Sequence, residues 1–191
     1  MELDYIKNKE FVGIDYSTEA LKIGEYEDCQ FINCNFSESK LSKIIFTNCE
    51  FTNCNLSLAK VLKTNFNNVS FKDCKMLGLY FDTANPFGLS FSFENCTLNH
   101  SSFYKTNIQE THFKDCQLIE VDFVQTNLKN TIFVNCDLSG AIFDNTDLTA
   151  VDFKTAFNYN INPEQNKLKK AVFSLSEITG LLNKYDIIIE K

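Results

Sequence analysis

Residues 113–153 read FKDCQLIEVDFVQTNLKNTIFVNCDLSGAIFDNTDLTAVDF. Every fifth residue of this stretch is large and apolar, and most residues between are polar. A spacing of five fits neither the 3.6-residue period of an α-helix nor the two-residue period of a β-strand. The stretch therefore predicts a repeated structural unit of five residues. The large apolar positions are Phe113, Leu118, Phe123, Leu128, Phe133, Leu138, Phe143, Leu148 and Phe153.

The same spacing continues toward the N-terminus. It runs without exception from Phe31 to Phe81, over eleven positions, and from Phe93 to Phe153, over thirteen. The residue two positions before each large one is mostly Cys, Ser, Thr or Ala. Each unit is thus expected to point one large and one small side chain inward. A weaker register precedes the first run at Ile6, Phe11, Tyr16 and Leu21.

The cysteines give the number of units in one coil. All eight occupy the small inward position, and they recur at intervals of twenty residues, which is four units. The chain is therefore expected to be an all-β solenoid with four sides per coil. Each Cys also follows an Asn or Asp, residue types that suit a corner because they tolerate a left-handed backbone. The cysteines are Cys29, Cys34, Cys49, Cys54, Cys74, Cys96, Cys116 and Cys136.

The composition excludes several function classes. All 18 basic residues are Lys, and the net charge is −7, which disfavours direct binding of nucleic acid. No nucleophile elbow, phosphate loop or Cys/His cluster at ligand spacing is present, so we expect no enzyme activity, metal or cofactor. The inward cysteines are expected to be free thiols. The N-terminus has no basic segment followed by an apolar run, and we therefore expect a cytoplasmic protein.

One interruption breaks the repeat. The step from Phe81 to Phe93 is twelve residues, two more than two units, and the extra residues fall within 84–90. Pro and Gly in this segment indicate a turn or bulge. It either joins two coil stacks or forms a contact loop that carries Asn85 and Phe87.

The C-terminal segment does not follow the five-residue repeat. Residues 174–177, Ser-Leu-Ser-Glu, read as a capping box, which predicts a short α-helix, and Ile187–Ile189 read as a short strand. This segment is expected either to cap the last coil or also to pair two rods. The predicted divisions are 1–25 (N-terminal coil or cap), 26–83 (first stack), 84–90 (interruption), 91–157 (second stack) and 158–191 (cap and dimerisation). The expected dimerisation residues are Phe173, Leu175, Ile178, Leu181, Leu182 and Tyr185.

The repeats resemble those of the pentapeptide-repeat proteins. Their units have a small residue, Asp or Asn, then Leu or Phe, as in Cys136-Asp-Leu138 and Thr146-Asp-Leu148. The resemblance implies a right-handed quadrilateral β-helix. Within the family the chain looks like the Qnr and MfpA type of quinolone-resistance protein. That type implies a homodimer formed through the C-terminus and, as partners, DNA gyrase and topoisomerase IV, which such proteins bind in place of DNA.

Surface charge offers a physical basis for such mimicry. Seven acidic residues lie between Asp115 and Asp152, against the single Lys129. Over about two coils this density is similar to that of duplex DNA, which carries one charge per ~1.7 Å. The first hypothesis is therefore a DNA mimic, and the alternative is a protein-interaction scaffold with an unassigned partner. The expected contacts are Glu120, Asp122, Asp137, Asp144 and Asp147, all of which are expected to face water.

Overall fold

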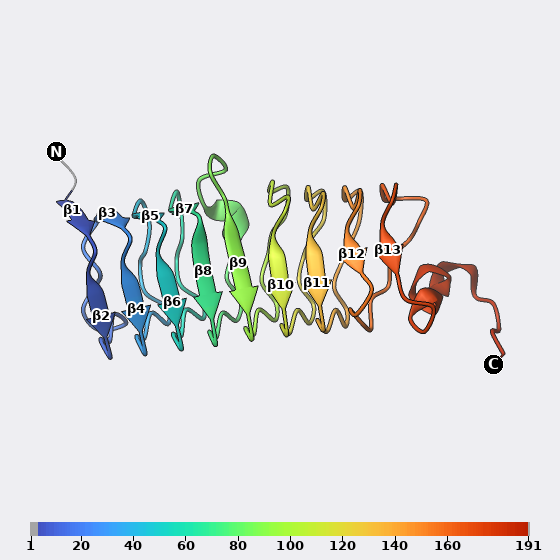
Figure 1. The fold of residues 1–191 in the computed structure, drawn as a ribbon, viewed down its shortest axis with the longest axis horizontal. Helices are drawn as coiled ribbons and strands as arrows, with labels where there is room; N and C mark the ends of the chain where they lie inside the picture. Colours follow the sequence, from blue (N-terminus) through green and yellow to red (C-terminus); the bar gives the residue numbers. More distant parts are fainter. Residues whose placement is uncertain (1–3, 191) are drawn as a thin grey trace.

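The computed structural model describes residues 4–190, which form an elongated parallel β-solenoid (Figure 1). The predicted quadrilateral β-helix is confirmed. The two chain ends lie at opposite ends of the rod, and short strands stack along it. The strands are β1 (Asp4–Lys7), β2 (Glu10–Val12), β3 (Gly24–Glu27), β4 (Gln30–Ile32), β5 (Ile45–Thr47), β6 (Glu50–Thr52), β7 (Asn65–Asn67), β8 (Val69–Lys72), β9 (Phe91–Glu94), β10 (His112–Lys114), β11 (Ile132–Val134), β12 (Asp152–Phe153) and β13 (Val172–Phe173).

Strand pairing confirms the twenty-residue coil. Phe31 pairs with Phe51, and Phe113 pairs with Phe133, in parallel register. Nine strands form one sheet along the whole rod, in the order β13-β12-β11-β10-β9-β8-β6-β4-β2. A second sheet, β1-β3-β5-β7, covers only the N-terminal half of another side. Nine strands about 4.8 Å apart give a rod of roughly 38 Å.

The inward residues stack in four columns, and each column defines one face of the rod. Rings on face 1 lie nearly parallel, as shown by the 5.0 Å between the ring centres of Phe113 and Phe133. Almost all these side chains are buried, so the core is a continuous apolar stack. Face 1 is centred on Phe11, Phe31, Phe51, Phe71, Phe93, Phe113, Phe133, Phe153 and Phe173; face 2 on Tyr16, Phe36, Leu56, Met76, Leu98, Leu118 and Leu138; face 3 on Leu21, Leu41, Val61, Phe81, Phe103, Phe123 and Phe143; and face 4 on Ile6, Tyr26, Phe46, Phe66, Ile108, Leu128, Leu148 and Leu168.

The corners use left-handed backbone, as the Asn and Asp pattern predicts. Asn33, Asn53 and Asp73, for example, have φ between 52° and 55°. The structure adds that many other corners place Lys, Leu, Glu or Ala in the same conformation, including Lys63 and Ala150. A left-handed residue with a Cβ costs roughly 1–2 kcal/mol relative to right-handed backbone. Stacking of the coils therefore imposes this conformation on residues that do not favour it.

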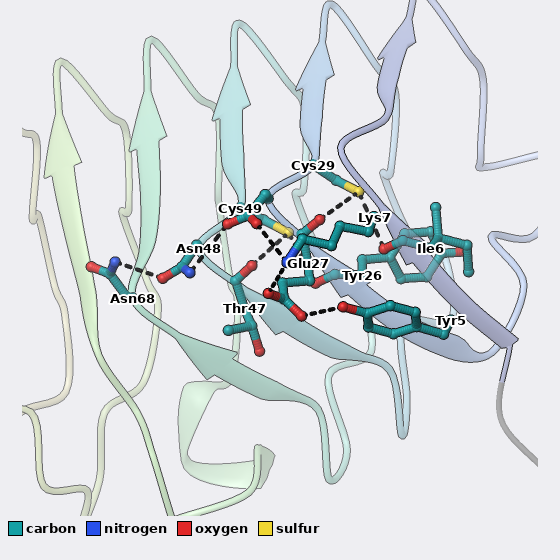
Figure 2. Close-up of polar contacts among 11 residues, drawn as sticks. Tyr5, Ile6, Lys7, Tyr26, Glu27, Cys29, Thr47, Asn48, Cys49 and Asn68 are labelled. Carbon is teal, nitrogen blue, oxygen red and sulfur yellow. Dashed lines mark hydrogen bonds and ion pairs between the residues drawn. The ribbon is translucent and has the colours of Figure 1, made fainter.

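The small inward side chains satisfy backbone carbonyls. The Cys54 Sγ lies 3.2 Å from the Phe31 carbonyl oxygen of the preceding coil, and the Thr126 hydroxyl donates to that of Phe103 at 2.7 Å. Figure 2 shows Cys29 and Cys49 in this arrangement. All eight thiols are free and buried, and burial raises the pKa of Cys49 to about 12. These thiols are thus part of the buried core.

Two extra residues at the interruption are accommodated by a loop. Val69 of β8 pairs with Phe91 of β9, a step of 22 residues rather than twenty. The chain forms a 3-10 turn at Phe81–Thr83 and then projects beyond the neighbouring corners before β9 (Figure 1). The Phe91 ring turns inward, 6.0 Å from Phe66 and 5.2 Å from Phe81. The core therefore remains continuous past the loop.

The C-terminus differs from its prediction. Two 3-10 turns, Ile178–Leu181 and Asn183–Tyr185, replace the predicted α-helix, and Ile187–Ile189 form no strand. The expected capping box is absent because the Glu177 carboxylate instead accepts the backbone N–H of Asn158 at 3.3 Å. Gly180 then packs against Tyr159, where an added Cβ would lie 2.3 Å from the Tyr159 carbonyl oxygen. Contact with the last coil, rather than helix propensity, decides the local structure.

Candidate interaction surfaces

The five predicted acidic contacts are spread over three faces. Glu120 and Asp137 belong to the units of face 2, Asp122 and Asp144 to face 3, and Asp147 to face 4. They lie within two coils along the rod but do not form a stripe on one side. A partner that touches all of them must wrap around the rod.

Three of these acids have a structural role, which corrects the expectation that all five face water freely. Asp122, Asp137 and Asp147 are half-buried, and each accepts the backbone N–H two residues further on, at 2.8–3.1 Å. Burial would raise the pKa of Asp137, but hydrogen bonds from Ser139 and Asn158 outweigh it and hold this pKa below its ordinary value. The repeat therefore favours Asp here for the fold as well as for charge.

The other two acids are exposed and have weaker ties to the rod. Glu120 lies at a corner with φ of 54°, and its carboxylate is 3.2 Å from the His100 Nδ1. Asp144 lies beside an open hollow between the coil of Gly140 and the C-terminal turn at Lys184. These two carboxylates are the ones most available to a partner.

The loop presents one aromatic side chain. Phe87 is 82% exposed, at the tip of the turn. The Asn85 side chain accepts the Phe87 backbone N–H at 3.1 Å, and the Asn85 backbone N–H donates to Thr64 of the neighbouring coil. Gly88 approaches Asn67 so closely that a Cβ would lie 2.3 Å from its side-chain oxygen. The base of the loop is therefore fixed, while Phe87 points into solvent.

The predicted dimerisation residues divide into two groups. Phe173 belongs to β13 and stacks on Phe153 at 5.2 Å, and Leu181 packs against the core. Ile178 and Leu182 are half-buried. Leu175 and Tyr185 are exposed, Leu175 at 88%, and they lie near a tail in which Ile187, Ile188 and Ile189 are also exposed. The segment thus closes the rod and leaves apolar side chains on its outer side.

At the opposite end the first coil leaves an open hollow of about 610 Å³. Phe11, Tyr16 and Tyr26 line it, with Lys22 and Glu19 at its margin. The sequence gives no sign of this hollow, because the weak N-terminal register does not mark where stacking begins.

Among residues 4–190 no group of three or more His, Cys, Asp or Glu side chains is placed to hold a metal ion. The described part of the chain also has no helix long and apolar enough to cross a membrane.

Paired charges elsewhere on the rod, such as Lys7 with Glu27 in Figure 2, link neighbouring coils.

Together, the stacked coils and left-handed corners define a repeat protein built from units of five residues. A family model for the pentapeptide repeat region matches residues 25–91, 89–156 and 107–181. The chain therefore belongs to the pentapeptide-repeat family.

Solved structures support the same fold. One trypsin-treated variant of QnrB1, a plasmid-mediated fluoroquinolone resistance protein, has 16% identity and a TM-score of 0.58, over 98% of this chain and 100% of that one. A second trypsin-treated QnrB1 variant has 17% identity and a TM-score of 0.53, over 98% of this chain and 92% of that one. No curated protein sequence matches the chain. At these identities the likeness concerns the fold.

Proposed function

We propose that the protein binds a type II topoisomerase, DNA gyrase or topoisomerase IV, at the surface where DNA would lie, and that it reduces poisoning of the enzyme by quinolones. The observation that carries the proposal is the excess of carboxylates between Asp115 and Asp152, where Lys129 is the only basic residue. The likeness of the fold to QnrB1 over almost the whole chain supports the choice of partner.

The coils between Asp115 and Asp152, here called the acidic coils, have a charge per unit length similar to that of duplex DNA. Two coils span about 10 Å, a length of duplex DNA that carries about six phosphates at ~1.7 Å per charge. Acids on three faces present charge around much of the rod, as the two strands of a duplex do. A basic groove in the partner would contact Glu120 and Asp144 directly. Asp122, Asp137 and Asp147 would add charge from their corner positions.

The test is binding of purified gyrase to a five-site variant in which each Asp becomes Asn and each Glu becomes Gln. Asn keeps the side-chain oxygen that accepts the corner N–H, so the fold is expected to persist. The control neutralises five exposed acids of the N-terminal half. The sites changed are Glu120, Asp122, Asp137, Asp144 and Asp147 in the variant, and Asp4, Glu10, Glu19, Glu38 and Glu50 in the control.

We expect the five-site variant to lose at least tenfold in affinity, and the control variant to bind as the parent does. Parent binding is expected to weaken as salt rises from 50 to 300 mM, because exposed charges are screened. Equal affinity of both variants, or no binding by the parent, would refute the proposal. The alternative of a scaffold for another protein would then stand.

Pairing of two rods through the C-terminal segment is also proposed. Its support is the apolar outer side of the tail, where Leu175 and Ile188 are the most exposed side chains. Light scattering of a Leu175→Ser, Ile188→Ser variant tests it. The variant is expected to have half the mass of the parent at high micromolar concentration in 300 mM salt, where charge-driven association is screened. An unchanged mass would refute end-to-end pairing.

A further inference from the structure

Face 3 gathers the apolar side chains that the coils leave exposed. Between residues 13 and 156, exposed large apolar side chains occur on face 3, at its edge with face 2, or in the loop, and the other faces have none. Such a one-sided distribution on a rod is typical of an interaction surface. On face 3 they are Ile23, Leu62, Tyr80, Tyr104 and Ile142; Leu58 lies at the edge and Phe87 in the loop.

Face 3 also carries a group of lysines without an acidic partner. Lys40, Lys43, Lys60 and Lys63 form no ion pair with any residue that the structure describes. On other faces some lysines pair across coils, such as Lys114 with Glu94 and Lys167 with Asp147, and others are also unpaired within residues 4–190. Lys40 and Lys60 are directly stacked neighbours in the backbone ladder, about 4.8 Å apart. Stacked like charges destabilise a sheet unless an anionic group faces them. The N-terminal half of face 3 thus favours an acidic partner.

The charge of face 3 reverses along the rod. The first coil of face 3 contains Glu19 and Lys22, the coil of Phe81 contains Asp82, the coil of Phe103 contains Lys105, and the C-terminal coils contain Asp122 and Asp144. The corner shared with face 2 carries Glu38 in the N-terminal half and Glu120 in the C-terminal half. No lysine follows Lys105 on this face before the last turn at residue 161. Face 3 is therefore basic in its N-terminal half and acidic in its C-terminal half.

We propose that face 3 binds a second copy of this chain in antiparallel orientation, basic half against acidic half. The two-fold axis lies in the plane of the interface, perpendicular to the rod, between the coils of Phe81 and Phe103. It reverses the direction of the second rod. Each side chain then faces the residue at the same lateral position of the opposite coil. Lys60 then meets Asp122 of the second copy, and Leu62 meets Val124.

The other coils of face 3 also place opposite charges against each other. The coil of Lys40 and Lys43 lies opposite the coil of Asp144, and Asp82 lies near Lys105 at the centre. This charge complementarity favours a second copy over an unrelated acidic chain. The reason is that each acidic coil of face 3 lies as far from the two-fold axis as the basic coil that it would face. The interface is isologous, as expected for a C₂ dimer.

The dimer is expected to be weak and to compete with the proposed partner. A strip about 35 Å by 12 Å buries roughly 400 Å² per copy, at the low end of specific complexes. It would cover Asp122, Asp144 and part of Glu120, three of the five acids assigned to topoisomerase binding. The inference does not depend on that function, because self-association is measured without a topoisomerase.

Sedimentation of the full chain at 10–200 μM and 50 mM salt tests the charge match, with Leu175→Ser and Ile188→Ser present in every variant so that end-to-end pairing does not contribute. Lys60→Glu is expected to weaken association at least tenfold, because two symmetry-related contacts become repulsive. The double variant Lys60→Glu, Asp122→Lys exchanges the charges and is expected to restore it. Lys129→Glu, an equal change on face 4, is the control and is expected to have no effect. Thermal midpoints verify that each variant is folded.

A disulfide trap tests the register. All native thiols are buried, so Cys introduced at Leu62 and Val124 provide the reactive pair. The Leu62→Cys, Val124→Cys variant is expected to form a covalent dimer on mild oxidation, and neither single variant is expected to do so to the same extent. A chain that stays monomeric and unlinked, or that binds poly-glutamate through Lys60 while monomeric, would overturn the proposal. So would failure of the charge exchange to restore association in a folded double variant.

Discussion

Phe113 provides the sharpest test of the stacked core. Its ring is fully buried, and it lies parallel to the rings of Phe93 and Phe133 at 5.0 Å on both sides. Rings of face 3, including Phe123 at 6.4 Å, contact it edge-on. Phe113→Ala removes all these contacts, and the coils above and below cannot collapse into the space without losing their backbone ladder.

Large-to-small changes of this kind cost about 3–5 kcal/mol through lost transfer energy and a residual cavity. Both stacked neighbours are lost here, so we expect about 4 kcal/mol, or a fall in Tm of roughly 8–16 °C for a chain of this size. Chemical denaturation followed by circular dichroism measures it. Phe87→Ala removes the same ring from an exposed site, and is expected to change the stability by less than about 0.5 kcal/mol. Equal midpoints for the two variants would refute the stacked column.

Five other variants test the corners and the cap. Ala150 has a left-handed backbone and Ala171 does not, so in thermal melts Ala150→Gly is expected to stabilise by about 0.5–1 kcal/mol and Ala171→Gly to destabilise by a similar amount. Asp137→Ala should cost about 1 kcal/mol at pH 7, and Asp137→Asn less; since its folded pKa is depressed, its contribution is present above about pH 4 and lost as pH falls through the folded pKa, which denaturation between pH 2 and 7 measures. Gly180→Ala should displace the C-terminal turns from Tyr159, and faster amide hydrogen exchange at residues 178–185 would report it.

The buried columns could be predicted because their period is unambiguous. A step of five with alternating large and small residues has few solutions, and the twenty-residue spacing of Cys gave the number of sides. Phe113 and Cys116 therefore occupy their predicted positions. The corners were predictable only where Asn or Asp marks them. No local sequence signal marks the left-handed backbone of Lys63 or Ala150, because the stacking of the coils imposes it.

The surfaces were harder to predict for a different reason. Asp137 was assigned to a partner because its charge is visible in sequence, whereas its bonds to Ser139 and Asn158 require the corner geometry. The Ser174–Glu177 pattern predicted a helix, but Glu177 bonds across to the last coil instead. The lysines in the N-terminal half of face 3 are separated in the sequence, and their grouping on one side shows only when the coils are stacked.

Quinolone-induced DNA cleavage by gyrase tests the central proposal most directly. Purified gyrase is incubated with relaxed DNA, ATP and a fixed quinolone concentration, and increasing amounts of parent, five-site variant or N-terminal control are added. We predict that the parent and the control lower the yield of cleaved DNA in proportion to their concentration, and that the five-site variant does not. Cleavage that the parent leaves unchanged, or that the folded five-site variant lowers as well as the parent, would contradict DNA mimicry by the acidic coils.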